Sequence, residues 1–354
     1  ELLERRPGRS VAAVVKKVDR STAVSDEAVG RDIDLEFRVV DPEPTSFYLQ
    51  MGNGGSEDTV DRFRLGFLHN NLLGRDDSLT LDFQGPFDVN EMSDNFGFFG
   101  SYDMPLWDPN WRLRFYGAYN KFQTANILGP DSPFIGEGVL VGDEVSYNLV
   151  HKDSWFLDVF GGLDFQSSKL ESSFFQQFGL NTTLSNLNLL DITAGVRANS
   201  VKGRYRPSAE AKLIYNLSDV LGLSDSQDFE DSRANTDPGY FLVRLQGSHS
   251  YQANQWLRLY QRMQAAWTPD RLVGARQFSL SPRGYDSFRA LGDTGLMVVT
   301  EPSISINALY FGRTEKTIPF RIDFVPVFFD VGVVKVENAG ASEEDYTTLL
   351  SIGT

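Results

Sequence analysis

The chain has 354 residues, enough for one large domain or two of ordinary size. Its formal net charge of −15 argues against nucleic acid as a partner, because a phosphate backbone requires a basic protein surface. It has no cysteine, which excludes a disulfide scaffold and thiolate chemistry, and its apolar runs are too short for a transmembrane helix of about 20 residues.

The first 43 residues have the pattern of a small α/β unit. Residues 1–5 (ELLER) resemble the end of a helix that stops at Pro7-Gly8. Segments 10–18 and 32–40 are predicted strands, and the second alternates apolar and charged residues. The run "DPEPT" then predicts a domain boundary near residue 43. Because the chain begins with Glu and shows no signal segment, we expect it to be a trimmed piece of a longer precursor.

From residue 44 onward, period-2 alternation recurs in segments of about ten residues and predicts about fourteen strands. Short joins such as 151–153 occur beside long polar ones such as 166–187 and 218–237. Short turns at one end and long loops at the other are typical of a bacterial outer-membrane barrel. A soluble β-sandwich, or several small barrels, is the alternative.

The alternation assigns side chains to the two faces of the predicted barrel. Polar residues of one face suit a wet lumen, and apolar residues of the other suit lipid. We expect the lipid-facing set to include Trp111, Leu113, Phe115, Trp155, Leu157 and Val159. Arg112, Arg114 and Asp158 are then expected to face the lumen.

The sequence offers little that resembles an active site. The three histidines are scattered, "GLSDS" (222–226) lacks the last glycine of a nucleophile elbow, and no helix is predicted after "GNGGS" (52–56). The acidic pairs Asp76-Asp77 and Glu343-Glu344 are interpreted as solvated turn charges. We therefore predict no catalytic residue, no metal site, no cofactor and no enzymatic activity.

The stretch "SLSPRGYDSF" (279–288) interrupts the strand pattern and carries the tip Arg283-Gly284-Tyr285. A later segment reads Phe328-x-Asp330-x-Gly332. Together with residues 45–83, these motifs resemble the two-partner secretion transporters of the outer membrane, the haemolysin secretion/activation proteins, within the BamA-like superfamily. The resemblance covers about residues 30–354.

The resemblance implies an all-β fold, a transmembrane antiparallel β-barrel, with sixteen strands in the family and the last strands missing here. Residues 1–43 would be the C-terminal remnant of a periplasmic POTRA domain, and residues 44–354 the barrel. A loop at 269–292 would fold inward, so that Arg283 pairs with Asp330 while Gly332 leaves room and Phe328 completes the wall motif. Pro282 stands where the family has valine, so we expect a compact or differently hinged loop.

The implied function is an outer-membrane pore of a Gram-negative bacterium that secretes an unfolded client polypeptide without nucleotide hydrolysis. Expected partners are the client, outer-membrane lipid and other envelope proteins, with no nucleic acid. Three alternatives stay open: a BamA-like insertase for other barrels, a structural component of an envelope complex, and an enzyme whose catalytic domain lies on the N-terminal side.

Overall fold

The computed structural model describes residues 10–17, 33–40, 43–52, 62–124, 134–152, 154–172, 183–200, 203–280, 282, 290–305, 323–324, 327–340 and 343–353. Strands dominate this part of the chain, and one short helix, α2 (Ser226–Ser232), lies among them. Within the described residues, no helix is long and apolar enough to cross a membrane.

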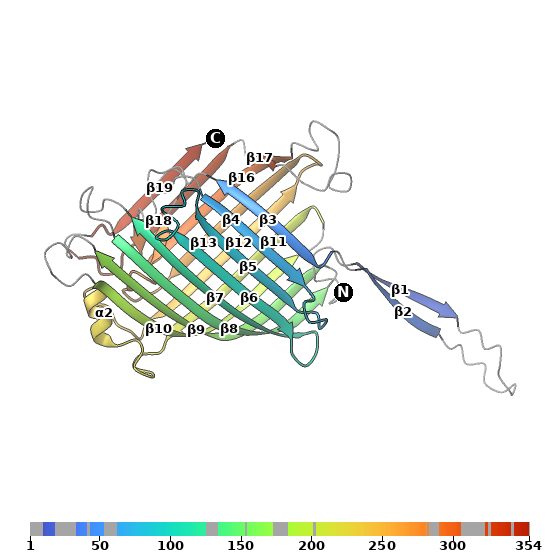
Figure 1. Ribbon diagram of the computed structural model, residues 1–354, viewed down its shortest axis with the longest axis horizontal. Helices are drawn as coiled ribbons and strands as arrows, with labels where there is room; N and C mark the ends of the chain where they lie inside the picture. Colours follow the sequence, from blue (N-terminus) through green and yellow to red (C-terminus); the bar gives the residue numbers. More distant parts are fainter. Residues whose placement is uncertain are drawn as a thin grey trace.

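Fourteen strands form one continuous antiparallel path that curls round into a barrel (Figure 1). Each strand pairs with the next, from β3 at one end of the path to β19 at the other, and the two-residue β17 (Asp323–Phe324) pairs with β16 beside it. The fourteen strands are β3 (Thr45–Gly52), β4 (Arg62–Asn70), β5 (Ser78–Pro86), β6 (Phe96–Pro105), β7 (Trp111–Thr124), β8 (Phe134–Lys152), β9 (Trp155–Ser172), β10 (Thr183–Ser200), β11 (Tyr205–Asn216), β12 (Phe241–Gln252), β13 (Leu257–Trp267), β16 (Thr294–Ser305), β18 (Phe328–Lys335) and β19 (Tyr346–Gly353). The predicted all-β antiparallel barrel is confirmed.

A separate hairpin precedes the barrel and projects from it (Figure 1). It consists of β1 (Ser10–Lys17) and β2 (Ile33–Val40), which pair antiparallel. Because Val15 pairs with Leu35 and Ala13 with Phe37, one face of the hairpin is apolar. The two strands expected here are therefore present. The expected helix at residues 1–5 lies outside the described residues, and the POTRA assignment stays a prediction.

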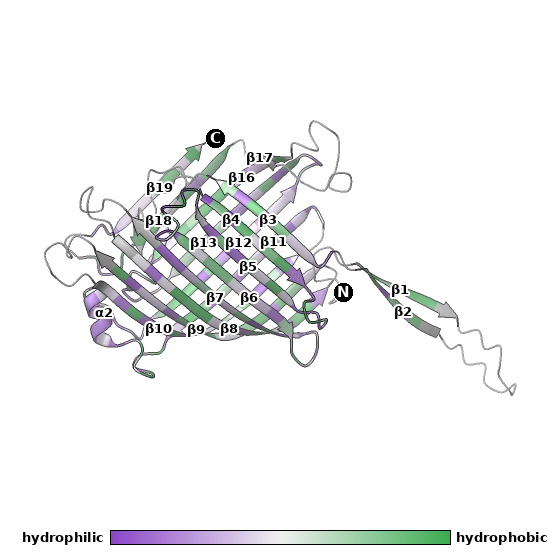
Figure 2. Cartoon of the chain, in the orientation of Figure 1, coloured by the Kyte–Doolittle hydropathy of each residue, from purple (hydrophilic) through white to green (hydrophobic). Residues whose placement is uncertain are grey.

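The pleat of the barrel strands separates an outer apolar face from an inner polar one, and Figure 2 shows the resulting alternation along the strands. On β9, Trp155 is 50% exposed whereas Asp158 is 1% exposed. Cross-strand partners share a face, so Phe115 of β7 and Leu163 of β9 lie on the outer side together. The expected outward and inward sets follow this register.

The outer face of β8 carries a carboxylate between apolar residues of the neighbouring strands. Asp143 of β8 pairs with Phe115 on one side and with Leu163 on the other. On the same face of β8, Tyr147 lies four residues away and Glu137 six. The register therefore places a carboxylate near the middle of the lipid-facing band.

Connections at the two ends of the barrel differ in length. At the end nearer the β1–β2 hairpin, five connections between described strands span two to seven residues, for example 71–77 and 201–204. At the opposite end, which we call the long-loop end, connections span nine residues or more, and the longest are 217–240 and 268–293. The predicted division into short turns and long loops is present except between β16 and β18, where residues 306–327 connect the strands at the short-turn end. The loop expected at 166–187 was too long, because β9 extends to Ser172 and β10 begins at Thr183.

Candidate functional site in the barrel lumen

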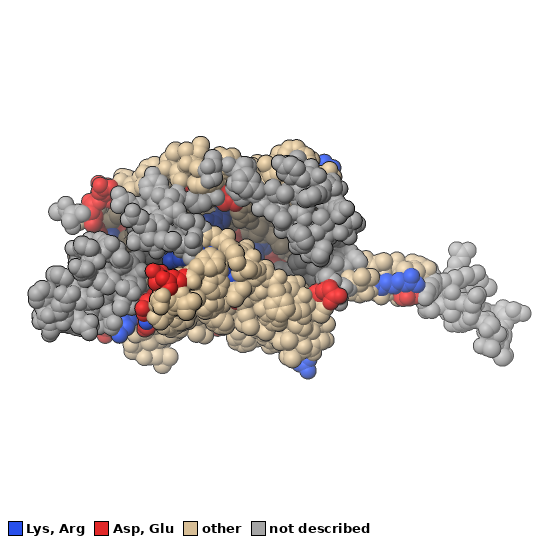
Figure 3. Space-filling view, turned by 45° about the horizontal axis from the view of Figure 1, so that its top comes forward, with Lys and Arg blue, Asp and Glu red and all other residues tan. Residues whose placement is uncertain are grey.

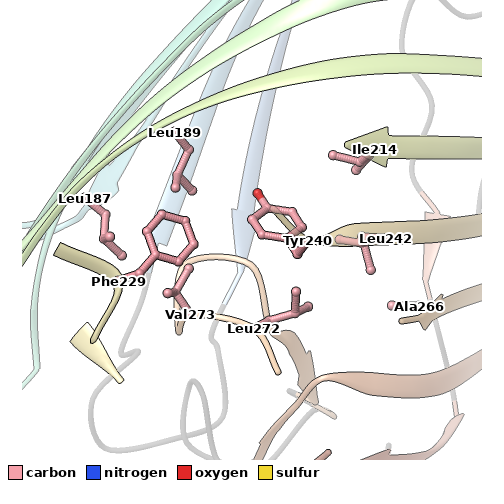
Figure 4. Close-up of a cluster of buried hydrophobic side chains, with 9 residues drawn as sticks. All are labelled: Leu187, Leu189, Ile214, Phe229, Tyr240, Leu242, Ala266, Leu272 and Val273. Atoms are coloured by element: carbon pink, nitrogen blue, oxygen red, sulfur yellow. The ribbon is translucent and has the colours of Figure 1, made fainter. Parts of the chain in front are cut away.

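The described residues of the connection between β13 and β16, which are 268–280, 282 and 290–293, pack against the inner side of the barrel. Leu272 and Val273 of this segment are fully buried. They contact an apolar cluster, shown in Figure 4, to which helix α2 and the inner faces of β10 to β13 contribute. The other members of this cluster are Leu187, Leu189, Ile214, Phe229, Tyr240, Leu242 and Ala266. The start of the segment is therefore held against the inner wall by apolar packing.

A buried ion pair fixes the same segment to β10. The guanidinium of Arg276 is bonded to the carboxylate of Asp191, and its Nε donates to the Tyr240 hydroxyl at 2.8 Å. Asp191 also accepts from Tyr240 at 3.0 Å and from the Asn216 amide at 2.9 Å. Asp191 is 1% exposed, so these bonds replace the water that its charge would require.

The second half of the segment forms a small hairpin, β14 (Phe278–Leu280) with β15 (Ala290–Gly292). Leu280 and Ala290 belong to a second apolar cluster, with Met297, Val299 and Val334 on the inner faces of β16 and β18. A Cβ atom on Gly332 would collide with the Leu280 side chain. Glycine at position 332 therefore allows Leu280 to lie directly on β18.

The structure places the wall half of the predicted motif on this inner face. Asp330 and Gly332 are buried, whereas their neighbours Phe329 and Val333 are exposed on the outer face. Phe328 shares the inner side because strand residues alternate. Arg283, Gly284 and Tyr285 lie outside the described residues, so their pairing with Asp330 stays a prediction. Pro282, which directly precedes them, is buried.

Ion pairs between adjacent strands and between strands two apart line the rest of the described lumen. Arg197 of β10 binds Glu144 through both terminal nitrogens at 3.1 Å and Glu210 through Nε at 2.7 Å. Lys212 of β11 reaches Asp164 of β9 at 2.9 Å. Figure 3 shows acidic and basic side chains gathered in a hollow of the molecule, whose visible outer strands carry other residues. The lumen wall is thus charged but largely neutralised by its own neighbours.

Two tyrosines lie flat across a glycine of the next strand. Tyr116 of β7 covers Gly142 of β8, and its hydroxyl donates to Asp164 of β9. Tyr48 of β3 covers Gly66 of β4 and donates to Asp82 of β5 in the same way. In each row the three residues are direct cross-strand partners, so each tyrosine ties three strands together from the luminal side.

Two acidic residues expected to be solvated are instead bonded. Asp77 is fully buried in the turn after β4 and accepts from the Leu73 backbone N–H and the Tyr102 hydroxyl. Burial raises the pKa of this carboxyl, but the bonds from Leu73 and Tyr102 outweigh it, and the net pKa is lowered. Glu343 binds two arginines at the long-loop end. Neither residue is a loosely solvated turn charge, and that expectation was wrong.

The Arg276–Asp191 pair was missed in the sequence although part of its signal was present. Asp191 occupies a luminal position of an alternating strand, and Arg276 stands seven residues before Arg283. Which luminal acid faces which arginine depends on contacts between residues 85 positions apart. Local periodicity cannot supply that information.

These features define an outer-membrane β-barrel protein with a polar lumen and a connection folded into it. The sequence profile described as "Haemolysin secretion/activation protein ShlB/FhaC/HecB" matches residues 32–354. The chain belongs to this two-partner secretion family, and its place is the outer membrane of a Gram-negative bacterium.

Solved structures of similar fold agree with this membership. CdiB from Escherichia coli aligns with a TM-score of 0.69 at 14% identity, covering 99% of this chain and 61% of the other. CdiB from Acinetobacter baumannii aligns with a TM-score of 0.63 at 15% identity, covering 99% and 60%. BamA from Haemophilus ducreyi lacking POTRA domains 1-3 aligns with a TM-score of 0.51 at 14% identity, covering 97% of this chain and 68% of the other. The chain thus spans about three fifths of the length of the CdiB structures. A search of curated proteins found no significant match.

Proposed function

We propose that the barrel is a pore through which an unfolded, secreted partner polypeptide crosses the outer membrane. The observation that carries this proposal is the polar lumen with the 268–293 connection packed against its wall by Arg276 and Leu280. Membership of the two-partner secretion family supports it. Folding of the client outside the cell supplies the direction, so no nucleotide hydrolysis is required.

Two features of the lumen suit passage of an extended chain. Arg197 and Lys212 are already bonded to acids two strands away, so these two cations are not free to hold a passing polypeptide. Tyr48 and Tyr116 brace the wall without projecting into the space, because each lies flat over a glycine. The lumen is thus stiff and weakly adhesive.

We further propose that the tip Arg283-Gly284-Tyr285 contacts the inner wall, with Arg283 paired to Asp330. Asp330 is 1% exposed on the same strand that Leu280 contacts through Gly332. Arg283 lies three positions after Leu280, and a fully extended chain spans at most about 10 Å over that stretch. The tip is therefore tethered within reach of the Asp330 region. The hairpin β1–β2 would belong to a periplasmic POTRA module that delivers the client.

Comparison of secreted proteins tests the proposal. Cells that produce the full-length protein are compared with a deletion strain by quantitative proteomics of the medium and of the washed cell surface. We expect one large polypeptide to disappear from these fractions and the other outer-membrane barrels to keep their abundance. A general loss of barrel proteins, with secretion unchanged, would instead indicate an insertase.

A further inference from the structure

Three connections at the long-loop end meet at four charged residues. Arg233 comes from connection 217–240, Arg271 and Asp293 from connection 268–293, and Glu343 from connection 336–345. We call these four residues the loop clasp. Their side chains are 0% to 28% exposed.

Arg233 joins all three connections by itself. Its Nη1 donates to Asp293 at 2.7 Å and to the Leu272 carbonyl at 2.5 Å, and its Nη2 donates to Glu343 at 3.0 Å. Arg233 is the C-cap residue of α2, whose Phe229 is fully buried in the cluster of Figure 4. The clasp therefore connects the helix to the loop in the lumen.

Arg271 makes a second connection between the same segments. Its Nη2 donates to Glu343 at 2.8 Å, its Nε to the Ala234 carbonyl at 3.0 Å, and its Nη1 to the Asn338 carbonyl at 2.9 Å. Arg271 thus bridges connections 217–240 and 336–345 from the middle one.

Asp293 holds the two ends of the luminal loop together. Its Oδ1 accepts from the Leu272 backbone N–H at 3.0 Å, and its Oδ2 accepts from the Glu337 backbone N–H at 2.8 Å. Asp293 is fully buried, so it depends on these donors. Charge-assisted bonds of this kind are strong and weakly screened by salt when water is excluded.

We propose that the loop clasp is a gate: it closes the long-loop mouth of the barrel and releases when a polypeptide leaves. The clasp ties α2 and the connection before β19 to Leu272 and Asp293, at the two described ends of connection 268–293, so that mouth widens only if these segments separate. The idea rests on the proposed transport function. It concerns opening of the pore, however, and can be measured with ions alone.

The test begins with purified protein in planar lipid bilayers containing KCl. Glu343→Gln removes the charge shared by Arg233 and Arg271, while Glu344→Gln is the matched control. Glu344 is exposed and is bonded to the Thr347 hydroxyl at 3.3 Å rather than to an arginine. Loss of charge-assisted hydrogen bonds should raise the fraction of time spent open about tenfold in Glu343→Gln. The control should match the wild type.

A reversible cross-link tests whether holding the loop clasp closed keeps the pore closed. The chain has no cysteine, so an Ala234→Cys/Ala339→Cys pair is the only target for a cleavable bis-maleimide. Ala339 is chosen because Asn338 has φ of 50°, a conformation that cysteine disfavours. Linking the pair should lower the open fraction below that of the wild type, and cleavage of the linker should restore it. Each single cysteine treated alike is the control.

Every outcome bears on the gate. An open fraction in Glu343→Gln equal to that of the wild type, with heat-modifiable migration showing a folded barrel, overturns it. Unchanged conduction in the cross-linked protein overturns it as well. If the gate responds as expected while no secreted partner is found, only the transport proposal fails.

Discussion

The guanidinium of Arg276 and the carboxylate of Asp191 form an ion pair inside the barrel, between a connection and the wall, where both are almost completely buried. Tyr240 bonds to both partners, at 2.8 Å and 3.0 Å. The connection is thus fixed to β10 by a hydrogen-bonded triad rather than by apolar contact alone.

Removal of one partner of this pair should release the connection. Arg276→Ala or Asp191→Ala leaves a buried charge unpaired, which costs about 3–5 kcal/mol, whereas the double mutant should lose no more than one single mutant. Limited trypsin digestion checks this, because a displaced connection exposes Arg271. Arg262→Ala, an exposed change on β13, is the control. If both single mutants resisted trypsin as well as the wild type does, the ion pair would not be what holds the connection in place.

Gly332 should tolerate a side chain only if Leu280 becomes smaller. Gly332→Ala should destabilise the inner packing by about 1–3 kcal/mol, because the new Cβ meets Leu280. Gly332→Ala/Leu280→Ala should recover part of this loss. Chemical denaturation in detergent measures it, with Gly247→Ala as control, since the nearest atom to a Cβ there is 3.7 Å away. Equal effects at Gly332 and Gly247 would refute the contact.

Asp143 should lower the stability of the barrel in lipid. A carboxylate on the lipid face costs less than the ~2–4 kcal/mol of Arg or Lys at the midplane, so Asp143→Leu should raise the free energy of unfolding by about 1–2 kcal/mol. Unfolding in lipid vesicles measures this, and Val145→Leu on the same outer face is the control. A lower stability in Asp143→Leu would show that the carboxylate has a stabilising partner in the membrane.

Glu343 should make the clasp sensitive to strong acid only. The Gly340 N–H, followed by Arg271 and Arg233, lowers the pKa of Glu343 from 4.5 to about 2. Since the folded pKa lies below the unfolded one, its stabilisation is complete above about pH 4.5 and is lost as the pH falls through 2. The difference in thermal stability between wild type and Glu343→Gln should stay constant from pH 8 to pH 5 and shrink below. A difference that shrinks near pH 6 would contradict this.

Arg283 and Asp330 should act as one unit. Removing either partner of a buried pair costs about 3–5 kcal/mol locally, and the double mutant should be no worse than the singles. Secretion of the partner identified by proteomics measures it, with barrel assembly checked by heat-modifiable migration. Full secretion in both Arg283→Ala and Asp330→Ala would remove the pair from the mechanism.

Period-2 alternation was sufficient to predict the strands, and with them the outward position of Trp155 and the luminal position of Asp158. The same alternation places Asp330 and Gly332 on the inner face of β18. Strand position and side-chain direction depend on residues close together in the sequence, so a local pattern is enough to predict them.

Contacts between distant segments were not predictable. The helix α2 lies in a stretch expected to be loop, and its N-cap Asp225, which accepts from the Gln227 N–H, was the available signal. The structural role of the helix, however, depends on Arg233, which donates hydrogen bonds to Asp293 and Glu343, 60 and 110 positions away in the sequence. Asp77 and Glu343 were misjudged for the same reason, since turn-like sequence does not reveal which donors the fold brings to a carboxylate.

Passage of a polypeptide through the barrel is the central claim, and reconstitution tests it most directly. The full-length protein is placed in proteoliposomes, the unfolded partner identified by proteomics is added outside, and protection from external protease is measured. The account predicts that the partner becomes protected with wild-type protein and with Glu344→Gln, without nucleotide. It predicts little protection with Arg276→Ala. A partner that remains fully digestible with folded wild-type protein in the membrane would contradict the claim.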